Sequence, residues 1–161
     1  MANEIERKFL ISALPNEVGQ QTKMEIEQGY LALDANGNEV RLRRISNTYF
    51  LTVKSNGTIQ RQEYEVELTS SQFHTLWEGT LGRRLEKDRF ILFRPSHKIE
   101  IDVYRQPLKG LIVAEVEFDS MEAANQYQKE AWMSQEVTHL NFLKNKNLLQ
   151  FESYEALKNL L

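Results

Sequence analysis

Short runs in which apolar and charged residues alternate dominate the chain up to Phe118. This period of two is typical of β-strands, whose successive side chains point to opposite faces of a sheet. The clearest run is Glu63-Tyr64-Glu65-Val66-Glu67-Leu68, where acids and apolar residues alternate throughout. The pattern predicts eight strands, at residues 4–11, 26–33, 39–45, 48–54, 61–68, 85–93, 97–104 and 111–118.

Turn and helix signals separate these runs. Asn36-Gly37 and Asn56-Gly57 predict type I′ hairpin turns, which need residues that tolerate positive φ. Between the fifth and sixth strands, Phe73, Leu76 and Trp77 have helical spacing, which predicts a helix capped by Ser70 or Ser71. After the eighth strand the pattern becomes helical. We predict a helix at 121–129 capped by Ser120, an ambiguous segment at 136–147 and an amphipathic helix at 152–161. No repeat or linker divides the chain, so a single domain over residues 1–161 is expected.

Within a strand, acids tend to occur together with acids and bases with bases. This grouping is less common on the solvated face of an ordinary sheet. Two carboxylates at i and i+2 lie about 7 Å apart and repel by roughly 2 kcal/mol at an effective dielectric of about 20. One interpretation places the charged face in water and the apolar face on a core. The other closes the strands into a barrel with charge inside and apolar residues outside. Its interior would hold the acids Glu4, Glu6, Glu63, Glu65, Glu67, Glu100, Asp102, Glu115 and Glu117 and the bases Lys8, Arg41, Arg43, Lys54, Arg61, Lys87, Arg89 and Lys98.

Composition narrows the class of protein. The chain has 161 residues, of which 41% are hydrophobic and 27% charged, as in a folded soluble domain. It contains no cysteine, which excludes disulfides, cysteine zinc sites and a cysteine nucleophile. The net charge of −3 gives no indication of a nucleic-acid or membrane partner. A charged N-terminus and the lack of a long apolar run favour the cytoplasm and argue against an outer-membrane barrel.

A series of charged motifs follows in a fixed order. It begins with Glu4-Ile5-Glu6-Arg7-Lys8 and continues with Gln28-Gly29-Tyr30-Leu31, Val40-Arg41-Leu42-Arg43, Thr52-Val53-Lys54, Arg61-Gln62-Glu63-Tyr64-Glu65, Lys87-Asp88-Arg89, Glu100-Ile101-Asp102, Glu115-Val116-Glu117 and Glu136-Val137-Thr138. Together these motifs resemble the CYTH superfamily, the triphosphate tunnel metalloenzymes, over about residues 4–150. The resemblance implies an α+β fold, an eight-stranded antiparallel closed β-barrel (tunnel) with a charged interior, covered by a few helices.

The resemblance also implies roles for individual residues. Mg²⁺ or Mn²⁺ would be bound by Glu4, Glu6, Glu115 and Glu117, with Glu63, Glu65 and Asp102 in support. Phosphate groups would be bound by Lys8, Arg41, Arg43, Lys54, Lys87 and Arg89, and Tyr30 lies where the family pattern has a tyrosine. Glu115, Glu117 and Lys87 are the expected catalytic residues, with Glu115 or Glu117 holding the metal-bound water. Hard divalent cations prefer such carboxylates together with substrate phosphates.

The expected activity is metal-dependent hydrolysis of inorganic triphosphate, or of a related short triphosphate, by in-line attack of metal-activated water. The short chain leaves little room for a nucleoside or thiamine pocket. Three alternatives remain open: a class IV adenylate cyclase that makes cyclic AMP and pyrophosphate from ATP, a thiamine triphosphatase, and a module that binds polyphosphate or nucleotides without turnover. An outer apolar face that the helices cover incompletely would favour a homodimer.

Overall fold

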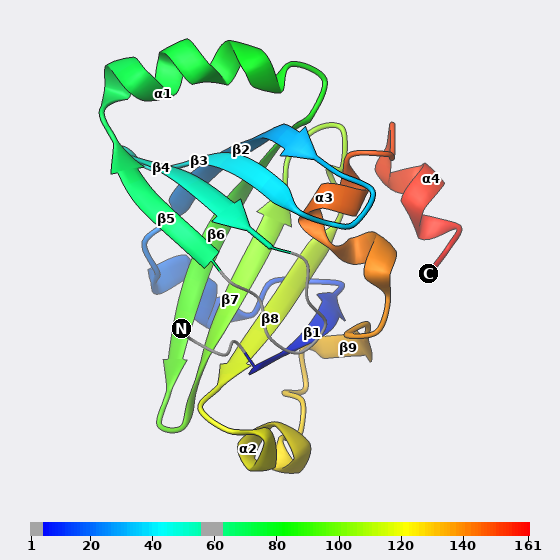
Figure 1. The fold of residues 1–161 in the computed structure, drawn as a ribbon. Coiled ribbons are helices and arrows are strands. Elements are labelled where there is room, and N and C mark those ends of the chain that lie inside the picture. The colour runs from blue at the N-terminus through cyan, green and yellow to red at the C-terminus, as the bar shows by residue number, and fades with distance from the viewer. Residues whose placement is uncertain (1–4, 56–62) are drawn as a thin grey trace. The chain divides into compact units, whose positions relative to one another are not determined.

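The computed structural model describes residues 5–55 and 63–161, in which the chain forms two units (Figure 1). Unit 1 comprises the described residues from Glu25 to Glu86. Unit 2 comprises the described residues before Glu25 and those from Lys87 to Leu161. The predicted metal ligand Glu4 and the predicted turn Asn56-Gly57 lie outside the described residues.

Unit 1 is an antiparallel meander. Its strands are β2 (Met24–Leu33), β3 (Glu39–Ile45), β4 (Thr48–Lys54) and β5 (Glu63–Leu68), and each pairs with the next. The helix α1 (Ser70–Trp77) and a 3-10 turn (Glu78–Thr80) cover one end of its apolar face (Figure 1). The turn can approach β2 closely because Gly29 has no side chain: a Cβ there would lie 2.6 Å from Thr80 Cβ. Tyr64 and Val66 of β5 stay more than half exposed on the same face, so the helix covers this face incompletely.

The N-cap of α1 differs from the predicted one. Neither Ser70 nor Ser71 caps this helix, since both lie within its first turn. Thr69 is the N-cap: its hydroxyl accepts from the backbone N–H of Gln72, and the Gln72 side chain accepts from the backbone N–H of Thr69. This reciprocal capping box satisfies two backbone donors that the helix would otherwise leave open.

Unit 2 contains the remaining strands in the order β6-β7-β8-β1-β9. They are β6 (Arg84–Arg94), which begins in unit 1, β7 (His97–Tyr104), β8 (Ile112–Phe118), β1 (Ile5–Ile11) and β9 (Met133–Glu136). Their apolar face forms a core with α2 (Met121–Gln126) and a 3-10 helix (Asn16–Gln20). The buried core residues are Phe9, Ile11, Val18, Leu92, Ile99, Ile101, Ala114, Val116, Phe118, Ala124 and Met133.

The side chain of Arg7, on β1, forms hydrogen bonds with β9 and with the end of α2. Its guanidinium donates to both carboxylate oxygens of Glu136, at 2.8 and 2.7 Å, and to the carbonyl oxygens of Ala124 and Tyr127. These contacts explain why β9 forms at all, because its own four residues are mostly exposed. The expected fold class, antiparallel strands with a few helices, is confirmed. The described residues contain nine strands, one more than the eight predicted.

The C-terminal region differs most from the prediction. Ser120 caps α2 as expected, but the helix ends at Gln126 because Tyr127 is extended. The ambiguous segment at 136–147 holds the end of β9, a 3-10 turn (Asn141–Leu143) and the start of α3 (Asn145–Leu148). The predicted helix at 152–161 shortens to α4 (Tyr154–Lys158), capped by Ser153. Among the described residues, no helix is long and apolar enough to span a membrane.

The turn at Asn36-Gly37 is not type I′. Gly37 has a φ of 87°, whereas Asn36 is not among the positive-φ residues of the described chain, and type I′ needs positive φ at both. Asp34 organises a longer turn instead. Its backbone carbonyl accepts from the Gly37 N–H, and its side chain accepts from the backbone N–H and the side-chain amide of Asn38. An aspartate that accepts bonds from nearby backbone groups is a common turn former.

Candidate functional site

The charged residues of unit 2 lie on the face opposite its apolar core, as their alternation predicts. In β1 and β8, Glu6 is the direct partner of Glu117, and Lys8 is the direct partner of Glu115. In β7 and β8, Glu100 is the partner of Glu115. The predicted site residues that this face brings together are Glu6, Lys8, Lys87, Arg89, Asp102, Glu115 and Glu117.

Asp102 lies at the centre of this face and is almost fully buried, with 1% of its side chain exposed. Its Oδ2 accepts from Lys87 Nζ at 2.6 Å and from an Arg89 terminal nitrogen at 2.8 Å, while Oδ1 accepts from Arg89 Nε at 2.7 Å. Burial disfavours the carboxylate, but Lys87 and Arg89 outweigh it and hold the pKa of Asp102 well below its usual range. Burial lowers the pKa of Lys87.

A second ionic group joins Glu115 to two bases. Lys8 Nζ lies 2.8 Å from Glu115 Oε1, and an Arg89 terminal nitrogen lies 3.9 Å from Glu115 Oε2. Another terminal nitrogen of Arg89 pairs with Glu100. Burial opposes charge on both members of the Lys8–Glu115 pair, yet their attraction raises the pKa of Lys8 and lowers that of Glu115. Both side chains therefore stay charged at neutral pH.

Glu6 and Glu117 form the most open acidic pair of this face. Like charges directly opposite each other in an antiparallel ladder are unfavourable unless a cation lies nearby. Lys98 Nζ lies 2.6 Å from Glu117 and 3.1 Å from Glu100, and 46% of the Glu117 side chain is exposed. Within residues 5–55 and 63–161, no three acidic or histidine side chains converge closely enough to hold a metal by themselves.

In unit 1, Tyr30 is held by two buried neighbours. Tyr30 is the direct partner of Arg41 across β2 and β3, and it is 1% exposed. The amide of Gln28, also 1% exposed, donates to the phenol oxygen at 3.0 Å, and the positive charge of Arg41 acts on the phenol from the neighbouring strand. Burial raises the pKa of Tyr30 well above its usual range, so the phenol keeps its proton. Arg41 is 6% exposed, and its buried Nε has no hydrogen-bond partner among the described residues.

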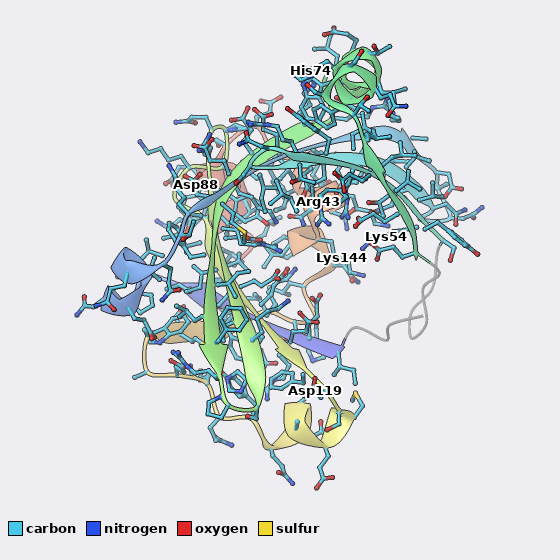
Figure 2. All side chains as sticks on the ribbon, turned by 90° about the vertical axis from the view of Figure 1, so that its left-hand side faces the viewer. Arg43, Lys54, His74, Asp88, Asp119 and Lys144 are labelled. Carbon is cyan, nitrogen blue, oxygen red and sulfur yellow. The ribbon has the colours of Figure 1, made fainter. Side chains whose placement is uncertain are left out.

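The remaining predicted residues of unit 1 form cross-strand pairs on the same face as Arg41. Glu65 accepts from the Thr52 hydroxyl at 2.7 Å and from Arg43 at 3.4 Å, and Lys54 Nζ lies 3.2 Å from Glu63. Figure 2 shows Arg43 and Lys54 on the side of the strands away from α1, whose His74 is also labelled. Unit 1 thus carries its predicted phosphate-binding residues on one polar face.

Three of the described buried polar residues of this face were not predicted as site residues: Gln28, Thr52 and Glu39. Gln28 and Thr52 are neutral, so the charge pattern did not select them, although each lies two positions from a predicted residue on the same strand face. That spacing was the available signal, because residues at i and i+2 share a face. Closure of the strands into a tunnel, the homodimer and the cytoplasmic location stay predictions.

Comparisons with known proteins agree with the expected resemblance. The model of the CYTH domain family matches residues 2–146. An inorganic triphosphatase from Nitrosomonas europaea is 41% identical over 146 residues, which cover 90% of this chain and 95% of that protein. The crystal structure of an inorganic triphosphatase matches with a TM-score of 0.76 and 38% identity, over 95% of this chain and 98% of that chain.

A more distant match shows the fold alone. A structure from Bacillus halodurans, described as a candidate adenylate cyclase, has a TM-score of 0.53 and 14% identity. The match covers 76% of this chain and 84% of that chain. At this identity the similarity says nothing about the reaction.

Proposed function

Because the chain belongs to the CYTH family, we propose that it hydrolyses inorganic triphosphate to pyrophosphate and phosphate. The observation that carries the proposal is its 41% identity to an inorganic triphosphatase over nearly the whole length of both proteins. The two charged strand faces support it, since a compact polyanion needs several buried bases that are already held in place. A triphosphate carries about −4 to −5 charge near neutral pH.

Bases on the charged strand faces would bind triphosphate oxygens. Arg41 suits this role because it is buried and its Nε has no partner in the described part of the chain. Guanidinium groups bind phosphate oxygens with two parallel hydrogen bonds, while ammonium groups act as point charges. Arg43, Lys54, Lys8, Lys87 and Arg89 are proposed as further phosphate-binding residues of their own units, and the Tyr30 hydroxyl would donate a hydrogen bond to a phosphate oxygen.

The donor set fits a hard divalent cation, either Mg²⁺ or Mn²⁺. Mg²⁺ is commonly held by one or two carboxylates, with water and substrate phosphates completing the shell. The opposed carboxylates of Glu6 and Glu117 supply such a pair, with Glu115 beside them on β8. Glu4 completes the proposed set but lies outside the described residues. When bound, the cation would neutralise phosphate oxygens and lower the pKa of the attacking water.

The proposed reaction is in-line displacement at a terminal phosphorus. A water oxygen forms the new bond to phosphorus, the bond to the bridging oxygen breaks, and pyrophosphate leaves as one proton is released. Glu115 or Glu117 would orient the water, and Lys87 would hold a phosphate oxygen whose negative charge rises during transfer. The protein's contribution to such a reaction is largely positioning and electrostatic stabilisation.

One assay tests the proposal against its alternatives. The purified protein is incubated with Mg²⁺ or Mn²⁺ and with inorganic triphosphate, ATP or thiamine triphosphate in turn, and phosphate, pyrophosphate and cyclic AMP are measured. Phosphate release from inorganic triphosphate, with little from the other two, is the expected result. Cyclic AMP from ATP, or rapid hydrolysis of thiamine triphosphate, would replace the proposal. No product from any substrate would favour a binding module.

A further inference from the structure

Asp102 is the most enclosed acid on the charged face of unit 2, and cations already occupy its oxygens. Lys87 and Arg89 donate three hydrogen bonds to it, at 2.6, 2.7 and 2.8 Å. A carboxylate has about four lone-pair positions, so these bonds use most of its capacity. These three bonds to cationic groups leave Asp102 little capacity for a further ligand.

A divalent cation at Asp102 would meet strong repulsion. Mg²⁺ binds carboxylate oxygens at about 2.0 to 2.1 Å, which would place it close to both the Lys87 ammonium and the Arg89 guanidinium. Glu117 lies in a more open environment. Its carboxylate faces that of Glu6, a single base (Lys98) lies 2.6 Å from it, and 46% of its side chain is exposed. The acids of this face therefore differ in kind, although their spacing in the sequence looks alike.

We propose that Asp102 is a positioning residue that fixes Lys87 and Arg89 for triphosphate binding and does not ligate the metal. This inference rests on the proposed function. The two bonds to Arg89 set the plane of its guanidinium, and the bond to Lys87 uses one ammonium proton and fixes the position of the group. The other two protons of Lys87 stay available to phosphate oxygens.

The geometry around Lys87 agrees with this role. Lys87 is 2% exposed, and its Nζ lies 5.5 Å from the centre of the Tyr104 ring. The Tyr104 hydroxyl is fixed in turn by a 2.6 Å bond to Asn145 Oδ1. A buried ammonium in such a site needs a fixed anionic partner, because an unpaired buried charge is strongly unfavourable. Asp102 is that partner, so its loss should weaken triphosphate binding by the two bases and leave metal binding unchanged.

The test compares Asp102→Asn with Glu117→Gln, each of which removes one carboxylate charge at nearly constant size. Mn²⁺ affinity is measured by electron paramagnetic resonance without triphosphate. Affinity for inorganic triphosphate is measured by calorimetry in EDTA, so that no turnover occurs. Asp102→Asn should keep Mn²⁺ affinity within about twofold and lose about 10- to 100-fold in triphosphate affinity, as expected for hydrogen bonds to charged groups. Glu117→Gln should show the reverse. A fall in Mn²⁺ affinity for Asp102→Asn as large as that for Glu117→Gln would overturn the inference.

A second comparison separates positioning from a general structural defect. If Asp102 acts through Lys87, the Lys87→Met and Asp102→Asn losses in triphosphate affinity should not add in the double variant. The double variant should bind within about twofold of the weaker single variant. Additive losses would contradict the proposed pathway through Lys87.

A measurement on the unaltered protein covers the case in which Asp102→Asn does not fold. Carboxyl ¹³C resonances are followed by NMR during an Mg²⁺ titration without triphosphate. The Glu117 resonance should move with Mg²⁺, whereas that of Asp102 should not; an Asp102 shift that saturates together with Glu117 would refute the inference. Failure of the hydrolysis assay would overturn the proposed function alone, since neither the Mg²⁺ titration nor binding in EDTA depends on turnover.

Discussion

Glu6 and Glu117 are direct partners across the antiparallel strands β1 and β8, so two carboxylates face each other on the polar side of unit 2. Opposed like charges are unfavourable, and Lys98, whose Nζ lies 2.6 Å from Glu117, offsets part of this repulsion. If the proposed divalent cation binds at this pair, the stability of unit 2 should depend on that cation.

Glu117→Gln should change the stability of the metal-free protein little, because it removes both the repulsion from Glu6 and the attraction to Lys98, whose Nζ lies 2.6 Å from Glu117. It should also remove most of the stabilisation that Mg²⁺ gives, which is about 2.7 kcal/mol at a hundredfold excess over Kd. Urea unfolding with and without Mg²⁺ measures both effects. Glu122→Gln, on the exposed surface of α2, is the control and should keep the full response to Mg²⁺. An unchanged Mg²⁺ response in Glu117→Gln would remove Glu117 from the proposed site.

Arg41→Lys should lower triphosphate affinity by about 10- to 100-fold while the fold is retained, since lysine keeps the charge but loses the planar fork of donors. The matched control is Arg44→Lys on the same strand. Arg44 lies on the opposite face and pairs with Glu27 at 2.8 Å, so its replacement should leave KM and kcat unchanged. Steady-state kinetics with inorganic triphosphate measure both variants. If Arg41→Lys changed the kinetics as little as Arg44→Lys, the positive charge of Arg41 alone would account for its part in triphosphate binding.

Tyr30→Phe should destabilise the protein by about 1 to 3 kcal/mol, because it leaves the buried Gln28 amide without its acceptor. Gln28→Met in the same chain should recover part of this loss, since both polar partners are then absent. Urea unfolding of the two single variants and the double variant gives the coupling energy, which we expect to be about 1 kcal/mol. Strict additivity would mean that the bond does not contribute to stability.

Gly29→Ala should cost about 1 to 3 kcal/mol, because the new methyl group would overlap Thr80 and the Trp77 ring. Both neighbours belong to the segment that covers β2, so the substitution should push that segment away from the strand. Gly19→Ala is the control: its Cβ would meet no atom within 4 Å, and its backbone is not in the positive-φ region. Thermal unfolding should separate the two variants by several degrees. Equal melting temperatures would show that the segment shifts at no cost.

The strands could be predicted because each one carries its own signal. The ranges 39–45, 48–54 and 97–104 agree with the structure residue for residue. In 39–45 and 97–104 the clear alternation fixes both the strand and its two faces, whereas it is weaker in 48–54. Strand β9 has no such signal. Its four residues are held by the contacts of Arg7 with Glu136, more than a hundred positions apart in the sequence. A strand that depends on a distant partner cannot be recognised from its own residues.

The candidate site, like the fold, could be predicted only in part from the sequence. Charged residues such as Arg41 and Glu117 were selected by alternation and by the resemblance, and the structure places them on the polar faces of their units. The difference between Asp102 and Glu117 could not be predicted, because both are acids at equivalent positions in their strands. It depends on the direction of Lys87 and Arg89, which are brought to Asp102 by the pairing of β6 with β7. Strand pairing, and not composition, therefore determines which acids already accept hydrogen bonds from bases.

Acid should weaken the contact that Arg94 makes with Glu130. Arg94 donates to both oxygens of Glu130, at 2.7 and 2.9 Å, and the Trp132 indole donates to the same carboxylate at 2.7 Å. Arg94 and, less strongly, Trp132 keep the pKa of Glu130 below its usual value of 4.5, against a smaller opposing effect of burial. A carboxyl whose folded pKa is depressed contributes stability above its unfolded pKa and loses it as the pH falls through the folded value.

Glu130→Gln should therefore cost about 1 kcal/mol at neutral pH, and the difference from the unaltered protein should shrink as the pH falls through the lowered folded pKa of Glu130. Urea unfolding at pH 7, 5 and 3.5 (approximate test values) measures this difference directly. His97, whose pKa is lowered by burial, and Glu17, which shares Arg94, are present in both proteins, so their titration largely cancels. Glu152→Gln, at an exposed position between α3 and α4, should give no pH-dependent difference. A loss for Glu130→Gln that stayed constant down to acid pH would mean that size and shape, rather than charge, account for the contribution of Glu130.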